Sequence, residues 1–293
     1  MAWTLTDDMA SYQAAAGDFL AADAVRNTVL LSILASLARI GPHAYGPGTP
    51  LFGWWSPEDC PHAPGDATVA AAILQTPPHA VLITTLPGQA AAQLATALAD
   101  RGAAPPGING AEPDATALAS AWLDVTGRHG QVRQRQRLYR LGEPVPPDPA
   151  PDGTARLATQ ADLEVARALY GAFAAEIGDA ITTDGLVEDR VRAGQLMLWE
   201  ARGEPVSIAG ATDVLAGVAR IGPVYTTPQH RGRGYGGAVT AAIGELAGRR
   251  GARSVVLFTD LANPVSNSLY VKLGYQPVED RVLLTFGAPG SGR

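Results

Sequence analysis

Residues 142–153 constrain the fold more than any other stretch of the chain, because five of these twelve residues are prolines. Proline fixes the backbone angle φ and has no backbone N–H, so this composition excludes a helix and disfavours a central strand. It predicts an extended, semi-stiff connector. In a chain of 293 residues, such a connector separates two parts of ordinary domain size. We therefore predict one domain at residues 1–141, a linker at 142–153 and a second domain at 154–293.

The overall composition predicts a folded, cytoplasmic protein, with 46% hydrophobic and 17% charged residues. No apolar run reaches the ~18–20 residues that span a bilayer, and the start lacks the pattern of a secretion signal. A single cysteine, Cys60, excludes an internal disulfide, and the histidines have no metal-ligand spacing. The net charge of −6 argues against nucleic-acid binding. We expect no metal, membrane or nucleic-acid partner, and the oligomeric state stays open.

The second part alternates between strand-like and helical patterns. Asn263 and Pro264 form a good helix start, and Gly274 fits the left-handed residue that ends a helix. The predicted strands are 156–158, 196–201, 206–213, 214–226, 254–259 and 282–286, and the predicted helices follow residue 160 and cover 235–249 and 264–273. Because the front strands are joined by tight turns, we predict an α/β fold with a mixed, mostly antiparallel sheet flanked by helices.

The first part has weaker patterns. They predict helices at 30–40, 90–101 and 114–126 and strands at 51–55, 68–74, 80–86 and 134–141. Residues 69–79 faintly echo residues 218–230, since both run from an apolar segment to a proline and a histidine. This echo indicates either an internal duplication or a chance match. Under the first interpretation, the first copy lacks the glycine-rich turn that follows in the second.

That turn, residues 228–237, reads Pro-Gln-His-Arg-Gly-Arg-Gly-Tyr-Gly-Gly and lies between a predicted strand and a predicted helix. Glycines leave backbone N–H groups unobstructed, and the helix start adds a partial positive charge, so the segment predicts a phosphate or pyrophosphate site. Arg231 and Arg233 can contact the same oxygens. The structural alternative is a turn that only packs a helix on a sheet.

Two common phosphate motifs fit this turn poorly. A P-loop requires Gly-Lys-Ser/Thr, and the turn contains no lysine. Gly232, Gly234 and Gly237 match the Gly-x-Gly-x-x-Gly dinucleotide pattern, but the preceding strands are predicted to be antiparallel. A nucleotide-binding oxidoreductase therefore remains only as an alternative.

Several motifs together resemble the GNAT superfamily of N-acetyltransferases. Arg231-x-x-Gly234-x-Gly236 is similar to the turn with which that family binds the pyrophosphate of acetyl-coenzyme A, and Asn263, Tyr270 and the run 273–275 are similar to its C-terminal pattern. The resemblance covers residues 154–287. The first part resembles the degenerate partner domain of tandem members, which implies that it shapes the acceptor cleft.

The resemblance implies a catalytic scheme. Two neighbouring strands, those with Val224 and Val255, are expected to splay and admit the pantetheine arm. An N–H of Val224 or Tyr225 then stabilises the oxyanion, since Pro223 cannot donate. Tyr270 matches the general acid that protonates the leaving thiolate. The implied cofactor-binding residues are Val224, Tyr225, Thr226, Arg231, Gly232, Arg233, Gly234, Tyr235, Gly236, Gly237, Asn263, Ser266 and Tyr270.

The general base is less determined. Glu200 is the candidate that we place in the catalytic set with Tyr270, because it follows Trp199 on a predicted strand that can face the acceptor pocket. The other candidates are Glu176, Asp179, Asp260 and His230, and a water relay is a further alternative.

The function that follows is an acetyl-coenzyme A-dependent N-acetyltransferase acting on the amine of a small molecule. Transfer is expected to be direct, in a ternary complex, because Cys60, the only cysteine, lies in the other part of the chain. The alternatives are an acyltransferase with another donor or acceptor and a non-catalytic acyl-coenzyme A-binding or sensing protein. The sequence does not identify the acceptor.

Overall fold

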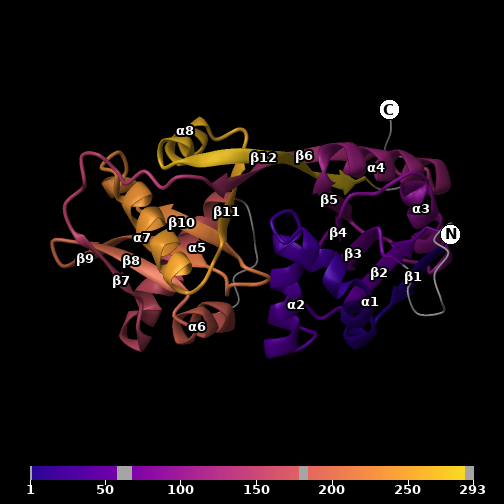
Figure 1. Ribbon diagram of the computed structural model, residues 1–293, viewed down its shortest axis with the longest axis horizontal. Helices are drawn as coiled ribbons and strands as arrows, with labels where there is room; N and C mark the ends of the chain where they lie inside the picture. The colour runs from indigo at the N-terminus through magenta and orange to yellow at the C-terminus, as the bar shows by residue number, and fades with distance from the viewer. Residues whose placement is uncertain (1, 58–67, 178–183, 288–293) are drawn as a thin grey trace. The chain divides into compact units, whose positions relative to one another are not determined.

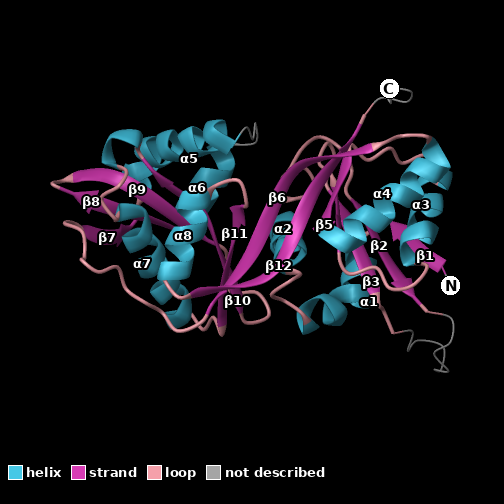
Figure 2. Ribbon diagram, turned by 90° about the horizontal axis from the view of Figure 1, so that it is seen from above, coloured by secondary structure: helices cyan, strands magenta, loops and turns pink. Residues whose placement is uncertain are grey.

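The computed structural model describes residues 2–57, 68–177 and 184–287, which form two compact units (Figures 1 and 2). Unit 1 comprises Met1–Arg137 and Glu279–Arg293, and unit 2 comprises Leu138–Val278. The chain passes from unit 1 to unit 2 within strand β6 (Gly130–Leu141) and returns within strand β12 (Tyr275–Phe286). The end of β12 therefore belongs to unit 1, and the proline-rich residues 142–153 belong to unit 2.

Unit 1 is a sheet with helices on both faces. Its remaining elements are β1 (Ala2–Thr6), α1 (Met9–Ala22), α2 (Thr28–Ile40), β2 (Leu51–Ser56), β3 (Ala71–Gln75), β4 (Val81–Ile83), α3 (Ala90–Asp100), β5 (Gly107–Ala111) and α4 (Glu112–Thr126). The strand order is β1-β2-β3-β4-β5-β12, and among these described neighbours four pairs are antiparallel while β4–β5 is parallel. Successive residues of β3 pack on opposite faces, Ile73 with α3 and α4 and Leu74 with α1 and α2, as the period-two geometry of a strand requires.

Unit 2 repeats this plan. Its elements are β7 (Thr154–Leu157), α5 (Leu163–Ile177), α6 (Asp184–Arg192), β8 (Leu196–Ala201), β9 (Glu204–Ala211), β10 (Val218–Thr226), α7 (Tyr235–Arg249), β11 (Ser254–Asp260) and α8 (Pro264–Lys272). The strand order is β7-β8-β9-β10-β11, with β6 beyond β11, and β10–β11 is the parallel pair. One face packs on α7 and α8 and the other on α5 and α6. In both units, a helix connects the two parallel strands.

The predicted fold class is confirmed: a mixed, mostly antiparallel α/β architecture in two domains. Strand β8 and helix α7 have the predicted bounds, and β12 begins seven residues before the predicted 282. The predictions missed β1, α1, β5 and α6. In β5, two glycines in five residues mimic a turn, and in α1 the alanine-rich sequence lacks a strong apolar stripe.

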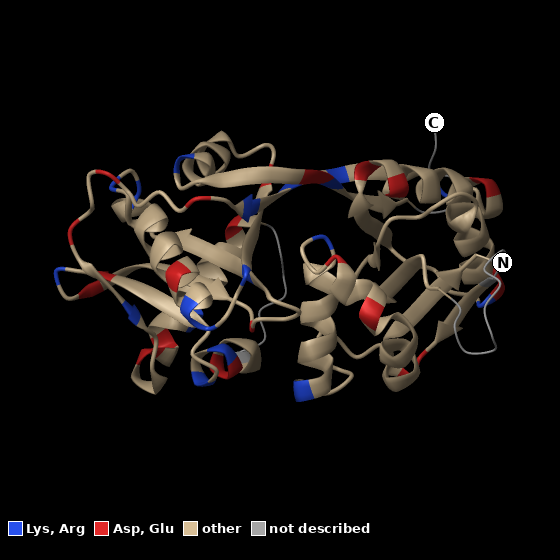
Figure 3. Cartoon of the chain, viewed as in Figure 1, with Lys and Arg blue, Asp and Glu red and all other residues tan. Residues whose placement is uncertain are grey.

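The arginine-rich strand β6 has acidic partners within unit 1. Arg137 pairs with Asp280 at 2.6 Å, and Arg135 pairs with Glu112 at 3.1 Å. Figure 3 shows acidic and basic residues interspersed on both units in this view. Across the described ranges, no helix is both long and apolar enough to cross a membrane.

Candidate active site

The parallel strands β10 and β11 separate before they end. They pair from Val218 opposite Ser254 to Ile221 opposite Leu257, and no further pairing joins their described residues. Beyond this point, β10 shifts register against β9 between Ile221 and Val224, and Pro223 has no N–H to donate. Residues 224–226 stay paired with β9 on one edge, so their edge toward β11 is open. The pantetheine arm was predicted to lie between these two strands.

The glycine turn directly follows the open edge. Gly232 and Gly234 have φ of +74° and +83°, a region that side chains with a Cβ rarely adopt. Gly234 is the N-cap of the fifteen-residue helix α7, and no side chain caps that helix start. The first N–H groups of α7 therefore remain available to an anion.

Arg231 is held in place from three sides. Its Nε donates to the carbonyl of Thr226 at 3.0 Å, its guanidinium lies 5.5 Å from the ring centre of Tyr225, and its Nη2 pairs with Glu176 of α5. The hydrogen bond to Glu176 is the main cause that raises the pKa of Arg231. The guanidinium is thus oriented beside the turn, with a carboxylate as its present counter-ion.

The proline-rich segment 142–153 borders the same turn. The sequence predicts it only as a connector and gives no sign of this contact. Tyr235 is buried, and its hydroxyl donates to Asp152 at 2.5 Å, while the carbonyl of Asp152 accepts from Trp199. This hydrogen bond lowers the pKa of the Asp152 carboxyl. A methyl group on Gly234 would lie 3.7 Å from Pro151. The end of the proline-rich segment, at Pro151 and Asp152, therefore packs against the start of α7 and holds Tyr235 in place.

Helix α8 is tied to β11 by a residue outside the predicted set. Asn267 donates to the carbonyls of Asn263 and Asp260 at 2.7 and 2.8 Å and accepts from Thr259 at 2.6 Å. Asn263 caps α8 by accepting from the N–H of Ser266 at 3.1 Å, as predicted. The sequence signal for Asn267 is its position four residues after Asn263 and three before Tyr270, on one face of α8, but this spacing does not separate an anchoring side chain from a ligand-binding one.

Tyr270 lies in the core between α8 and the sheet, and Val224 packs against the same cluster. Its ring meets that of Tyr275 edge-on at 5.8 Å, and only 7% of the residue is exposed. Among the described residues, its hydroxyl makes no hydrogen bond. Burial raises the pKa of Tyr270 to about 12, so the phenol holds its proton at neutral pH. A protonated hydroxyl without a partner is what a general acid requires.

Glu200 is not brought together with Tyr270. It lies on β8, with β9 between it and β10, and its carboxylate accepts from Arg156 at 2.6 Å. Arg156 also forms a bidentate pair with Asp162 at 2.8 Å, which lowers the pKa of Asp162. Glu200 thus belongs to an ion-pair network at the β7 edge of the sheet.

The other predicted base candidates are engaged or outside the described ranges. His230 bonds through Nδ1 to the hydroxyl of Thr227 at 2.8 Å, and Asp260 accepts from the N–H of Ala262 at 2.8 Å. Glu176 pairs with Arg231. Asp179 lies outside the described residues. Gly237, predicted to bind the cofactor, is buried against Leu269, where a methyl group would come within 3.1 Å.

The second unit thus combines a mixed sheet with an open parallel strand pair, a helix without a side-chain cap after a glycine turn, and a buried tyrosine. Residues 167–275 match the family model described as "Acetyltransferase (GNAT) family". Residues 167–275 thus form a domain of the GNAT family, whose general function is acyl transfer, and a tandem GNAT protein shares the fold of the chain as a whole.

Solved structures with the same fold cover both units. A GNAT-family acetyltransferase from Colwellia psychrerythraea is 10% identical with a TM-score of 0.58, over 98% of this chain and 100% of that one. A GCN5-related N-acetyltransferase from Sphaerobacter thermophilus is 18% identical with a TM-score of 0.56, over 90% and 92%. A tandem GNAT protein from the clavulanic acid biosynthesis pathway is 16% identical with a TM-score of 0.55, over 99% and 100%. Comparison with curated proteins found no match.

Proposed function

We propose that this protein is an N-acetyltransferase that moves an acetyl group from acetyl-coenzyme A to the amine of a small molecule. The observation that carries the proposal is the open edge of β10 directly before the glycine turn and the uncapped start of α7. An extended pantetheine arm needs the first feature, and a pyrophosphate needs the second. The GNAT-family match over the same residues supports acetyl-coenzyme A as the ligand that uses both.

In this proposal, the backbone N–H groups of the turn hold the pyrophosphate, with Gly232, Gly234 and Gly236 leaving them accessible. Arg231 and Arg233 contribute charge. The arm lies along residues 224–226 and reaches Asn263 and Ser266 at the start of α8. Tyr235 and Gly237 serve the site by positioning the start of α7. Tyr235 donates a hydrogen bond to Asp152, and Gly237 packs on Leu269.

The reaction proposed is direct attack in a ternary complex. The neutral amine adds to the thioester carbonyl, and a backbone N–H of Val224 or Tyr225 stabilises the oxyanion that forms. As the tetrahedral intermediate collapses, the carbon–sulfur bond breaks and the carbon–nitrogen bond remains. Tyr270 gives its proton to the sulfur, and water returns one to the phenolate. The pKa of Tyr270, raised by burial, means that the phenol carries its proton before each turnover, as a proton donor must.

The amine must also lose a proton, and we propose that water receives it. The pairing of Glu200 with Arg156 holds that carboxylate in an ion-pair network, which argues against Glu200, the base candidate predicted from the sequence. The acceptor is defined here only as a small-molecule amine.

Calorimetric titration tests the coenzyme site. We expect acetyl-coenzyme A to bind the full protein and NADH, a dinucleotide control, to show no binding. Absence of acetyl-coenzyme A binding would overturn the proposal. Binding of NADH in its place would instead favour the dinucleotide alternative.

A thiol-release assay against a panel of small amines tests the chemistry. We expect release of free coenzyme A that depends on one class of amine, with the acetylated product confirmed by mass spectrometry. Propionyl- and malonyl-coenzyme A in parallel identify the acyl preference. Tight coenzyme binding without turnover on any amine would favour a non-catalytic acyl-coenzyme A-binding protein.

A further inference from the structure

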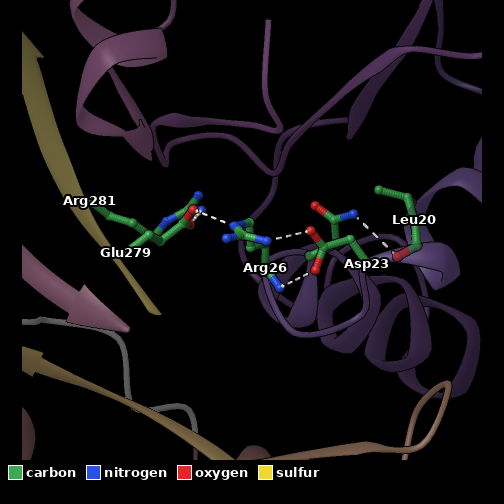
Figure 4. A network of polar contacts seen from close by, with 6 residues as sticks. Leu20, Asp23, Arg26, Glu279 and Arg281 are labelled. Carbon is green, nitrogen blue, oxygen red and sulfur yellow. Dashed lines mark hydrogen bonds and ion pairs between the residues drawn. The ribbon is translucent and has the colours of Figure 1, made fainter. Parts of the chain in front are cut away.

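Unit 1 contains a cavity of about 220 Å³ that the proposed acetyl transfer does not use. The end of α1 and the turn after it form one wall, the residues after β4 and at the end of β5 form another, and β12 supplies two charged side chains. Every lining residue belongs to unit 1. Figure 4 shows the charged side chains of this cavity from close by.

Four charged residues of alternating sign form a chain along the cavity. Asp23 pairs with Arg26 at 2.9 Å, Arg26 pairs with Glu279 at 3.1 Å, and Glu279 pairs with Arg281 at 2.8 Å (Figure 4). The side chain of Arg281 is only 5% exposed, and that of Glu279 only 15%. Hydrogen bonding to Asp23 is the main cause that raises the pKa of Arg26. Because the two positive and two negative groups balance, the chain is neutral overall.

The two guanidinium groups retain hydrogen-bonding capacity. Each has five N–H donors. Within the described residues, Arg281 donates one hydrogen bond to Glu279 and one to the carbonyl of Ile83, and Arg26 donates one to Glu279 and one to Asp23. Both arginines line the cavity, so their remaining N–H groups are available to a ligand with acceptor oxygens. A carboxylate is the group that fits a guanidinium best.

The neutral balance of the site restricts which carboxylate can bind. A simple monoanion would leave an excess negative charge beside Asp23 and Glu279, and burying uncompensated charge is costly. A ligand with an ammonium group as well as a carboxylate keeps the balance, because each of its charges meets the opposite sign in the chain. The rest of the lining includes the apolar side chains of Phe19, Ala22, Ala70 and Ala111, which can hold a short aliphatic group.

The cavity does not suit a coenzyme. Its volume is below the ~300 Å³ at which sites for drug-sized ligands begin. The parallel strands β4 and β5 pair at Val81 and Leu82, and beyond them Arg281 donates to the carbonyl of Ile83 at 3.4 Å. In unit 1, the first carbonyl beyond the parallel pairing thus accepts a hydrogen bond from a guanidinium.

We propose that this cavity of unit 1 binds a free α-amino acid with a short aliphatic side chain. The carboxylate of the amino acid bonds to the spare N–H groups of Arg26 and Arg281. Its ammonium group bonds to Asp23 and Glu279, and its side chain lies against the alanines. Binding here requires neither coenzyme nor acyl transfer.

Titration of the full protein with three matched probes tests this site, by calorimetry or ligand-observed NMR without coenzyme. L-Valine carries both charges, isobutyrate only the carboxylate, and isobutylamine only the ammonium group. We expect L-valine to bind about tenfold or more tightly than either single-charge probe, because each lost charged contact costs about one order of magnitude in affinity. No binding of L-valine, or equal binding of all three, would overturn the proposal.

Isosteric variants locate the binding. Asp23→Asn keeps the shape of a half-exposed residue and is expected to weaken L-valine binding about tenfold, whereas Asp100→Asn, at the end of α3, leaves it unchanged. Glu279→Gln gives a second test from β12, and thermal melts confirm that each variant is folded. Gly234→Ala, which targets the coenzyme turn, is expected to bind L-valine normally. Equal affinities for Asp23→Asn and Asp100→Asn would place the amino acid elsewhere and refute the assignment.

Discussion

Replacing Gly234 by alanine separates the strain of the glycine turn from its binding role. The residue has φ +83°, and a new Cβ would meet only Pro151 at 3.7 Å, which is ordinary van der Waals contact. The cost is therefore backbone strain without a clash, about 1–2 kcal/mol for a left-handed residue with a Cβ. Gly248→Ala in the last turn of α7 is the matched control, because a Cβ there meets nothing within 4 Å and its φ is not positive. That variant is expected to gain about 0.5–1 kcal/mol.

The two variants should thus move stability in opposite directions on one helix. Scanning calorimetry should show unfolding about 2–8 °C lower for Gly234→Ala and slightly higher for Gly248→Ala. In titrations, acetyl-coenzyme A affinity should fall at least about tenfold for Gly234→Ala alone, since the methyl group stands where an anion approaches the N–H groups. If Gly234→Ala bound the coenzyme normally and matched Gly248→Ala in stability, neither the strain nor the site at this turn would stand.

The other predictions concern charge and protonation around the same site. Tyr270→Phe should keep coenzyme affinity and slow turnover about 10²–10⁴-fold, while Tyr275→Phe, its edge-on neighbour, should stay close to wild type in a thiol-release assay; equal rates would leave Tyr270 as a packing residue. The free energy of unfolding should fall between pH 10 and 12, because tyrosine in the unfolded chain has a pKa near 10 whereas the pKa of Tyr270 in the folded protein is about 12. Chemical denaturation of Tyr270→Phe over the same pH range should show a smaller fall. Glu176→Gln should tighten coenzyme binding about 1.4–5-fold at low salt, because the exposed ion pair with Arg231, worth about 0.2–1 kcal/mol, no longer competes with the coenzyme. Weaker binding of the coenzyme to this variant would show that Glu176 assists coenzyme binding.

Local signals in the sequence were sufficient for much of unit 2. Asn263 and Pro264 predict the start of α8, and Gly232 and Gly234 mark positions of positive φ. The glycine turn and the strand and helix on either side of it could therefore be predicted. The partners of charged residues could not. Arg156 lies 44 positions from Glu200 and Arg231 lies 55 from Glu176, and only the folded sheet brings these pairs together.

The proline-rich segment shows the same limit. Its composition predicts an extended conformation, but composition does not say what such a segment contacts. In the structure, Gly142 and Val145 donate to the carbonyls of Gly274 and Leu273, and Asp152 accepts from Tyr235. A stretch that was predicted to connect two domains is thus hydrogen-bonded at both of its ends to other residues of unit 2. Prediction from the sequence also placed a boundary there, whereas the chain passes between units inside two long strands, where no break in pattern marks the crossing.

The two units share one topology but differ at their parallel strand pairs. In unit 2, β10 and β11 stop pairing after Ile221, and a glycine turn follows, which leaves both an open backbone edge and free helix N–H groups. In unit 1, β4 and β5 stop pairing after Leu82, and Arg281 from β12 donates to the next carbonyl. A buried guanidinium there occupies one carbonyl of the edge along which a pantetheine arm would lie, and in our proposal its spare donors bind a carboxylate. Arg281 therefore links the two proposals, because the same guanidinium that bonds the carbonyl beyond the parallel pair of unit 1 also lines the charged cavity.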